Sequence, residues 1–251
     1  MEPGHDPART GATMHDARTI VAAIDFSECS GHALAHAGRL AAWSRGTLAG
    51  VHVVNVPALR PVPPALFPHE LPTHEWLVSS AKQDIPEFSG RYLGKPLEHV
   101  EVRLGDPRDE LVAAVAERGA DVLVIGATSG TRRDRGVGTV AAGCVRKAPC
   151  KVLVVRDDAP PAFRVVAACV DFSPTSMEAL TQAVRFAALD NASLLIVHTY
   201  DDPWRGMSMS SVVQQNMPDF RDRLRGAVEQ RLREFAAPLE RELGALKAQF
   251  H

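Results

Sequence analysis

The sequence predicts an α/β fold: a doubly wound sheet of five parallel strands, followed by a partial second copy of the same fold. Short apolar runs alternate with amphipathic helical segments along residues 19–155, a pattern typical of parallel strands joined by helices. The most apolar run, Val122 to Ile125, leads directly into a glycine-rich loop and then a helical segment. The stretch Val165 to Tyr200 also aligns without gaps to Thr19 to Val54, at a constant offset of 146 residues.

Composition and charge limit the classes of protein to which this chain can belong. The chain has 251 residues, of which 45% are hydrophobic and 23% charged, and its formal net charge is -2. This balance predicts a soluble globular protein that binds neither nucleic acid nor a membrane, and no apolar run approaches the ~20 residues of a membrane span. The four cysteines show no C-x-x-C spacing, which favours reduced thiols. Residues 1–17 are polar and lack the apolar core of a signal peptide, so we expect a disordered tail and a cytoplasmic protein.

Residues 18–157 are expected to form the first α/β domain. Strands are expected at Thr19–Ile24, Leu48–Val56, His99–Leu104, Val122–Ile125 and Lys151–Val155. Helices are expected at Gly31–Ser44, Glu75–Tyr92, Arg108–Arg118 and Val140–Val145, where apolar residues recur at helical spacing. Six prolines between Pro57 and Pro72 exclude regular structure there and predict a long loop.

Polar residues follow the first strand. Asp25 stands at its carboxyl end, where open α/β sheets bind ligands, so the residue is a candidate for ligand binding or for a capping role. Ser27 or Ser30 is expected to cap the next helix, because a serine oxygen accepts hydrogen bonds from free N–H groups at a helix start. His52 lies within the second strand, and we expect it to be a hydrogen-bonded core residue.

The glycine-rich loop is the strongest candidate for a ligand site. Glycines at 126, 130, 136 and 138 allow a tight backbone, and Thr139 begins the helical segment that follows. Free N–H groups at a helix N-terminus favour a phosphate, and arginines at 132, 133 and 135 add positive charge. The sequence therefore predicts an anion-binding loop.

Two motifs resemble the universal stress protein family: Asp-Phe-Ser at Asp25, and the run GTVAAGCVRKAPCKVLVVR from Gly138 to Arg156. The resemblance covers Thr19 to Arg156, implies the sheet order 3-2-1-4-5, and makes the repeat a tandem arrangement. It also implies that a nucleotide would be bound by Asp25, Val53, Gly126, Gly130, Gly138 and Thr139. The family's loop pattern is G-x2-G-x9-G-[ST]; here Ser129 takes the second glycine position and the final spacing is one residue shorter. This departure predicts that the first domain binds a nucleotide weakly or not at all.

The function implied by the resemblance is that of a stress-response-associated binding protein that is not an enzyme. ATP or another adenine nucleotide is the candidate ligand of the first domain, and magnesium would enter only with the nucleotide. The sequence has no Walker lysine motif, nucleophile elbow or paired catalytic carboxylates, so we assign no catalytic residue and no metal site. Two alternatives stay open: an interaction module whose nucleotide site has decayed, and a weak nucleotide hydrolase in which Asp134 is the only acid of the loop.

Residues 158–163 read as a linker, and residues 164–251 as an incomplete second domain. Its expected elements are two strands and two helices, with one amphipathic segment from Pro218 to Phe250 that Pro238 kinks or restarts. Such a half-domain leaves a sheet edge open, which implies either a truncated chain or a covering partner. In the family the last strand commonly pairs with its counterpart, so we expect a homodimer through Val152 to Val155.

Overall fold

The computed structural model describes residues 17–55, 73–128, 136–201, 211–246 and 248–251. The chain divides into two compact units, residues 1–161 and 162–251. No helix in the described ranges combines the length and the apolar character needed to cross a membrane.

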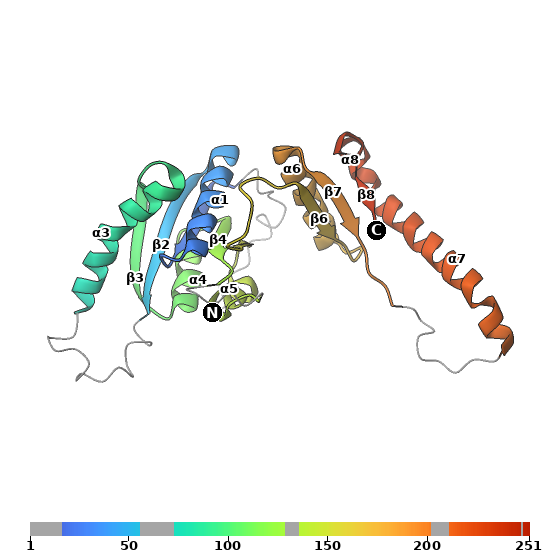
Figure 1. Ribbon diagram of the computed structural model, residues 1–251, viewed down its shortest axis with the longest axis horizontal. Helices are drawn as coiled ribbons and strands as arrows, with labels where there is room; N and C mark the ends of the chain where they lie inside the picture. The colour runs from blue at the N-terminus through green and yellow to red at the C-terminus, as the bar shows by residue number, and fades with distance from the viewer. Residues whose placement is uncertain (1–16, 56–72, 129–135, 202–210, 247) are drawn as a thin grey trace. The chain divides into compact units, whose positions relative to one another are not determined.

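The first unit contains the predicted five-stranded parallel sheet. Its strands are β1 (Thr19–Ile24), β2 (Thr47–Asn55), β3 (His99–Gly105), β4 (Val122–Gly126) and β5 (Lys151–Val155). They lie in the order β3-β2-β1-β4-β5, which confirms the predicted 3-2-1-4-5 order (Figure 1). Because neighbouring strands are parallel, their carboxyl ends meet at one edge of the sheet.

Four helices cover the two faces of this sheet: α1 (Glu28–Ser44), α3 (His74–Leu93), α4 (Pro107–Glu117) and α5 (Thr139–Lys147). Helix α1 packs on β1 and β4 and contacts α3, whereas α4 and α5 contact each other on the opposite face. Side-chain caps define three of the starts, at Ser27 for α1, Thr73 for α3 and Asp106 for α4. The sequence predicts a cap at Ser27 or Ser30, and the structure shows that the cap of α1 is Ser27.

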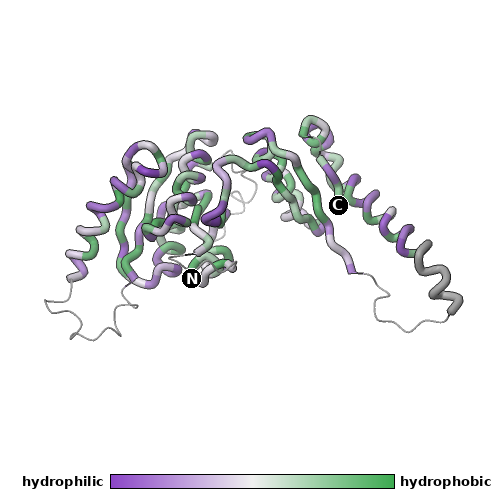
Figure 2. The backbone as a smooth tube through the Cα atoms, viewed as in Figure 1, coloured by the Kyte–Doolittle hydropathy of each residue, from purple (hydrophilic) through white to green (hydrophobic). Residues whose placement is uncertain are grey.

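The central strands are fully buried, as the continuous apolar runs predict. Val21, Val51 and Leu123 are each at most 1% exposed, and Figure 2 shows hydrophobic residues along the strands. Asp121 joins the start of β4 to that of β1, because its Oδ2 accepts hydrogen bonds from the N–H groups of Arg18 (2.7 Å) and Thr19 (3.0 Å). These contacts fix the register that brings the strand ends together.

The described residues of the second unit form more helices and strands than the sequence predicts. Its elements are β6 (Val165–Cys169), α6 (Pro174–Asp190), β7 (Ser193–Val197), α7 (Ser211–Ala236), a 3-10 turn (Ala237–Leu239), α8 (Glu240–Leu246) and β8 (Gln249–Phe250). The sheet order β6-β7-β8 repeats the order β1-β2-β3 of the first unit.

The prediction that Pro238 kinks or restarts the amphipathic segment is confirmed, but the helical part ends before Phe250, the predicted end of the segment. Pro238 has no N–H to donate, so the helix gives way to a 3-10 turn at that point. The last residues leave the helical conformation because β7 offers a free edge: the N–H of His251 donates to Ile196 O at 2.8 Å, and the N–H of His198 donates to His251 O at 2.9 Å. The described part of the second unit therefore has three strands, where the sequence predicts two.

A group of ion pairs joins β3 to α4 in the first unit. The Arg103 guanidinium, whose side chain is 13% exposed, donates to Glu101 at 2.6 Å and to the carboxylate of Glu117. Burial alone would raise the pKa of Glu101, but hydrogen bonds from Arg118 and Arg103 outweigh it and hold the pKa below its ordinary value. The hydrogen bond from Arg103 also lowers the pKa of Glu117.

We expect the contribution of these ion pairs to the stability of the first unit to depend on pH, and the Arg103→Met variant tests this. Carboxyl groups whose pKa is lower in the folded state stabilise the fold above their unfolded pKa of about 4.3, and the stabilisation is lost as pH falls through the folded values. The gap in melting temperature between the wild-type protein and Arg103→Met should therefore narrow between about pH 6 and about pH 3. Lys95→Met is the control, because Lys95 and Glu98 are 73% and 74% exposed and their pair should contribute little at any pH. A constant gap for Arg103→Met would contradict the prediction.

Candidate functional site

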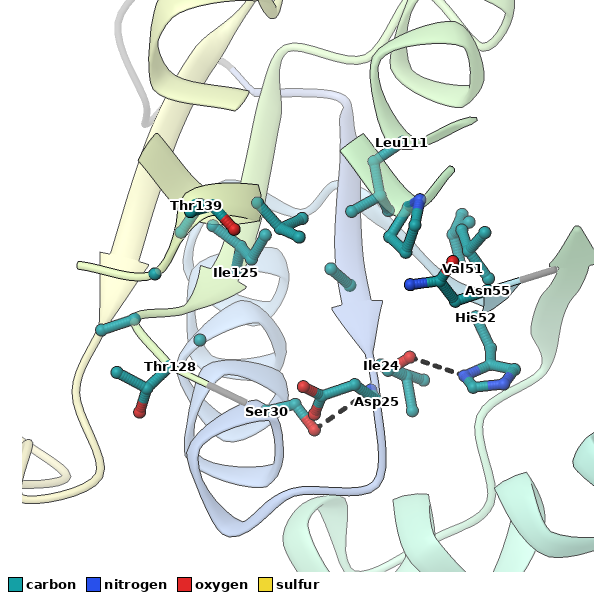
Figure 3. Close-up of a pocket in the computed structure, with 18 residues that line it drawn as sticks. Ile24, Asp25, Ser30, Val51, His52, Asn55, Leu111, Ile125, Thr128 and Thr139 are labelled. Atoms are coloured by element: carbon teal, nitrogen blue, oxygen red, sulfur yellow. Dashed lines mark hydrogen bonds between the residues drawn. The ribbon is translucent and has the colours of Figure 1, made fainter. Parts of the chain in front are cut away.

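A cavity of about 350 Å³ opens at the carboxyl edge of the first unit's sheet (Figure 3). It lies among the ends of β1, β2 and β4 and the first turns of α4 and α5. Its lining residues are Ala23, Ile24, Asp25, Ser30, Val51, His52, Val53, Asn55, Pro107, Leu111, Ile125, Gly126, Ala127, Thr128, Gly138, Thr139, Val140 and Ala141. The volume is in the range of sites for small molecules.

Asp25 is held by the turn that joins β1 to α1. Its Oδ1 accepts hydrogen bonds from the N–H (3.0 Å) and the hydroxyl of Ser27. The N–H of Ser30 donates to Ser27 Oγ at 3.1 Å, and the Ser30 hydroxyl donates to Ser27 O at 3.0 Å. The hydrogen bonds from Ser27 hold the carboxylate in place, and because Asp25 is exposed, the carboxylate is also accessible.

Phe26, between Asp25 and Ser27, has a φ of +63°, the left-handed conformation that aromatic residues rarely adopt. Its ring contacts His52 and Phe88, with centroid distances of 4.8 and 5.4 Å. His52 Nδ1 lies 2.8 Å from Ile24 O, and because a carbonyl oxygen only accepts, Nδ1 carries the proton. The histidine thus has the hydrogen-bonded role that the sequence predicts, and it fixes the end of β1.

Two glycines form the opposite wall of the cavity. A Cβ on Gly126 would lie 3.1 Å from the backbone carbon of Cys29 and from the backbone nitrogen of Ser30, so a side chain there would crowd the start of α1. Gly138 is the N-cap of α5 and has no side chain to cap the helix. Its own N–H donates to Ala127 O at 2.7 Å, which holds the start of α5 against the end of β4. The N–H groups of the first turn of α5 therefore lie at the cavity, and no side chain of the described residues caps them.

A third wall is apolar. Val51 and Val53 of β2 and Leu111 of α4 line it, and the ring of Pro107 lies at the start of α4. The cavity thus combines an apolar side with the Asp25 carboxylate and a helix N-terminus. Such a combination can accept a flat ring at one end and an anionic group at the other.

The structure brings five of the six predicted residues to this cavity: Asp25, Val53, Gly126, Gly138 and Thr139 line it. Gly130 lies outside the described residues, as do Ser129 and the three arginines of the loop. Sequence reasoning missed Asn55, Thr128, Pro107 and Leu111. The position of Pro107 beside the cavity depends on the strand order.

The second unit repeats the turn around Asp25 without the glycine wall. Asp171 Oδ1 accepts from the N–H of Ser173 at 3.0 Å, and hydrogen bonds from the hydroxyl and then the N–H of Ser173 lower the pKa of Asp171 to about 2. Phe172 has a φ of +66°, and its ring lies 4.2 Å from that of His198. The described part of this unit contains no counterparts of β4, α5 or Gly138.

Within the described residues, no three histidine, cysteine, aspartate or glutamate side chains are grouped so that they could hold a metal ion.

Comparisons with known proteins agree with this architecture. The model of the universal stress protein family matches residues 17–156 and again residues 162–246. A universal stress protein from Archaeoglobus fulgidus DSM 4304 is 15% identical, with 95% of this chain and 77% of that chain covered at a TM-score of 0.59. A putative universal stress protein from Pseudomonas aeruginosa UCBPP-PA14 is 15% identical, with 94% and 74% covered at a TM-score of 0.57.

A universal stress protein from Lactobacillus plantarum is 25% identical, with 58% of this chain and 99% of that chain covered at a TM-score of 0.43. No curated protein matches the sequence. The family model covers most of the chain in two successive segments, in agreement with the internal repeat. The chain therefore belongs to the universal stress protein family, in a tandem arrangement.

Proposed function

We propose that the first unit binds an adenine nucleotide in the cavity at the carboxyl edge of its sheet, and that the protein acts as a nucleotide-binding protein and not as an enzyme. In this proposal the base lies against the apolar wall of Val51, Val53 and Leu111, near the Asp25 carboxylate. The phosphates lie at the N-terminus of α5, beside Gly138 and Thr139. Magnesium enters only as the counterion of the phosphates.

One observation carries the proposal: the N-terminus of α5, which no side chain of the described residues caps, lies at a cavity whose other side is apolar. The first N–H groups of a helix have no partner within the helix, and the helix dipole adds a partial positive charge. Gly138 offers no side-chain oxygen to these groups, in contrast to the caps of α1, α3 and α4. An anionic group of a ligand supports the helix start in place of a cap.

Asp25→Ala is expected to weaken ATP binding while costing little stability. Among the described residues, only Ser27 donates hydrogen bonds to the exposed Asp25 carboxylate, and α1 keeps its own cap at Ser27. Calorimetric titration with ATP and magnesium measures the affinity, and thermal unfolding without ligand measures the stability. Asp171→Ala is the matched control, because it removes the same turn contact in a unit without the glycine wall.

Three outcomes distinguish a ligand-binding role of Asp25 from a capping role and from a decayed nucleotide site. Weaker binding for Asp25→Ala and unchanged binding for Asp171→Ala support the proposed site. A stability loss above about 2 kcal/mol for Asp25→Ala contradicts a ligand role and indicates a capping one. If the wild-type protein binds no ATP, the shortened loop favours the alternative, an interaction module with a decayed site.

We also propose that the protein forms a homodimer through Val152 to Val155 of β5. The two edges of the first sheet differ: β3 carries the charged pair Glu101 and Arg103, whereas β5 is apolar after Lys151. Charges on an edge strand oppose pairing, and an apolar edge with free N–H and C=O groups favours it. Light scattering at micromolar concentration is expected to give a mass near twice 27.1 kDa. A monodisperse monomer would rule out the dimer.

A further inference from the structure

We propose that Phe26 is a positioning residue for the ligand site: its left-handed backbone holds the Asp25 carboxylate toward the cavity. This inference rests on the proposed nucleotide site, because the carboxylate it positions is the one assigned to the ligand. Phe26 itself is not among the residues that line the cavity. Its action is therefore through Asp25.

The first step of the argument is the geometry of the turn. Asp25 and Ser27 are joined by an N–H to Oδ1 hydrogen bond of 3.0 Å that spans a single residue. This bond is that of an Asx-turn, which Phe26 completes with a positive φ at the central residue. The orientation of the Asp25 carboxylate thus depends on the conformation of Phe26.

The second step is the state of the two carboxylate oxygens. Both hydrogen bonds from Ser27 go to Oδ1. Among the described residues, no hydrogen bond to Oδ2 is found. Figure 3 shows the Asp25 carboxylate directed from the end of β1 toward the side on which Thr128 lies. The turn therefore occupies one oxygen and leaves the other for a ligand.

The third step is why a phenylalanine holds this conformation. Left-handed backbone is disfavoured for residues other than glycine, asparagine and aspartate, so the surrounding structure must stabilise it. The Phe26 ring packs on His52 and Phe88, and His52 is bonded to Ile24, the residue before Asp25. One ring contact, Phe88, lies on α3, and the other, His52, lies on β2 and is among the residues that line the cavity, so both elements fix the turn.

The repeat supplies a matched control. Phe172 has the same conformation, the same histidine contact and the same turn, but its unit has no glycine wall in the described residues. Substitutions at Phe26 and Phe172 should therefore have similar effects on their own turns. Only those at Phe26 should change nucleotide binding.

The experiment compares Phe26→Asn, Phe26→Val, Phe172→Asn and Phe172→Val. Asparagine tolerates the left-handed conformation, whereas β-branched valine does not, and both lack the aromatic ring. Phe26→Val should weaken the binding of ATP with magnesium by about tenfold or more, as expected when a charged hydrogen bond is lost. Phe26→Asn should bind within about threefold of the wild-type protein, and both Phe172 variants should bind like the wild type.

Hydrogen exchange of the Ser27 amide, measured without ligand, reports the hydrogen bond to Asp25 directly. Its protection should be retained in Phe26→Asn and reduced in Phe26→Val. If Phe26→Asn loses affinity as much as Phe26→Val does, the ring and not the backbone matters, and the inference is overturned. It is also overturned if the exchange rate of the Ser27 amide is unchanged in Phe26→Val. If the wild-type protein binds no ATP, the nucleotide proposal fails, while exchange of the Ser27 amide still tests the turn.

Discussion

Leu34→Ala is expected to lower the free energy of unfolding of the first unit by about 2–5 kcal/mol, the range for removing a buried leucine side chain. Leu34 lies on α1, which packs on β1 and β4, and none of its surface is exposed. The surroundings are strands fixed by parallel pairing on both sides, so they cannot collapse into the space that the leucine leaves. Urea denaturation measures the loss. Leu34→Met is the control, because it nearly conserves volume and should cost less than about 1.5 kcal/mol.

The repeat extends this prediction to Leu180, which is the counterpart of Leu34 and is also fully buried. The core of the second unit rests on one described sheet of three strands, so the same loss removes a larger share of its stability. We expect Leu180→Ala to abolish hydrogen-exchange protection across residues 162–251, whereas Leu34→Ala should reduce protection in residues 17–161. Equal protection in wild type and Leu180→Ala would contradict this view of the second core.

The fold of the first unit could be predicted because its signals are local. The runs at β1 and β4 are apolar without interruption, and burial on both faces requires that composition. The structure places β5 at the predicted bounds, Lys151–Val155, because Pro149 ends the preceding helix region and the following Arg156 is exposed. The sheet order came from the family resemblance, since no local pattern determines which strands become neighbours.

The third strand of the second unit could not be predicted for the opposite reason. Gln249 and Phe250 form two residues of strand, too short to show any alternation. Their conformation depends on the free edge of β7, to which His251 donates, and this edge exists only in the folded unit. Tertiary pairing therefore overrides the helical spacing that the leucines before it suggest.

The same distinction holds at the candidate site. Asp25 and Gly138 could be placed there because the ends of parallel strands and the start of the next helix meet at one edge. Pro107 and Leu111 could not, because α4 reaches the cavity only through the position of β3 beside β2. The left-handed conformation of Phe26 has no signal in the sequence either, since it results from ring contacts with residues of β2 and α3.

Gly138→Asp is expected to abolish nucleotide binding while leaving the fold intact. Gly138 has φ -63° and ψ 160°, an ordinary conformation for any residue at an N-cap; an added Cβ would lie 3.2 Å from Ala127 O and 3.8 Å from Thr128 Cα, so the backbone at Ala127 must shift by a few tenths of an ångström. Aspartate is among the best N-caps, so its carboxylate should accept hydrogen bonds from the first turn of α5 and occupy the place proposed for the phosphates. Affinity for ATP should fall by about 100-fold or more, since the ligand loses these N–H groups and also meets a like charge. Gly138→Asn has nearly the same shape without the charge, so it should lose less affinity; calorimetric titration and thermal unfolding of both variants measure the difference. Retained ATP affinity in Gly138→Asp would place the phosphates elsewhere, whereas a melting temperature well below that of Gly138→Asn would mean that the charge disturbs the fold and not only the ligand.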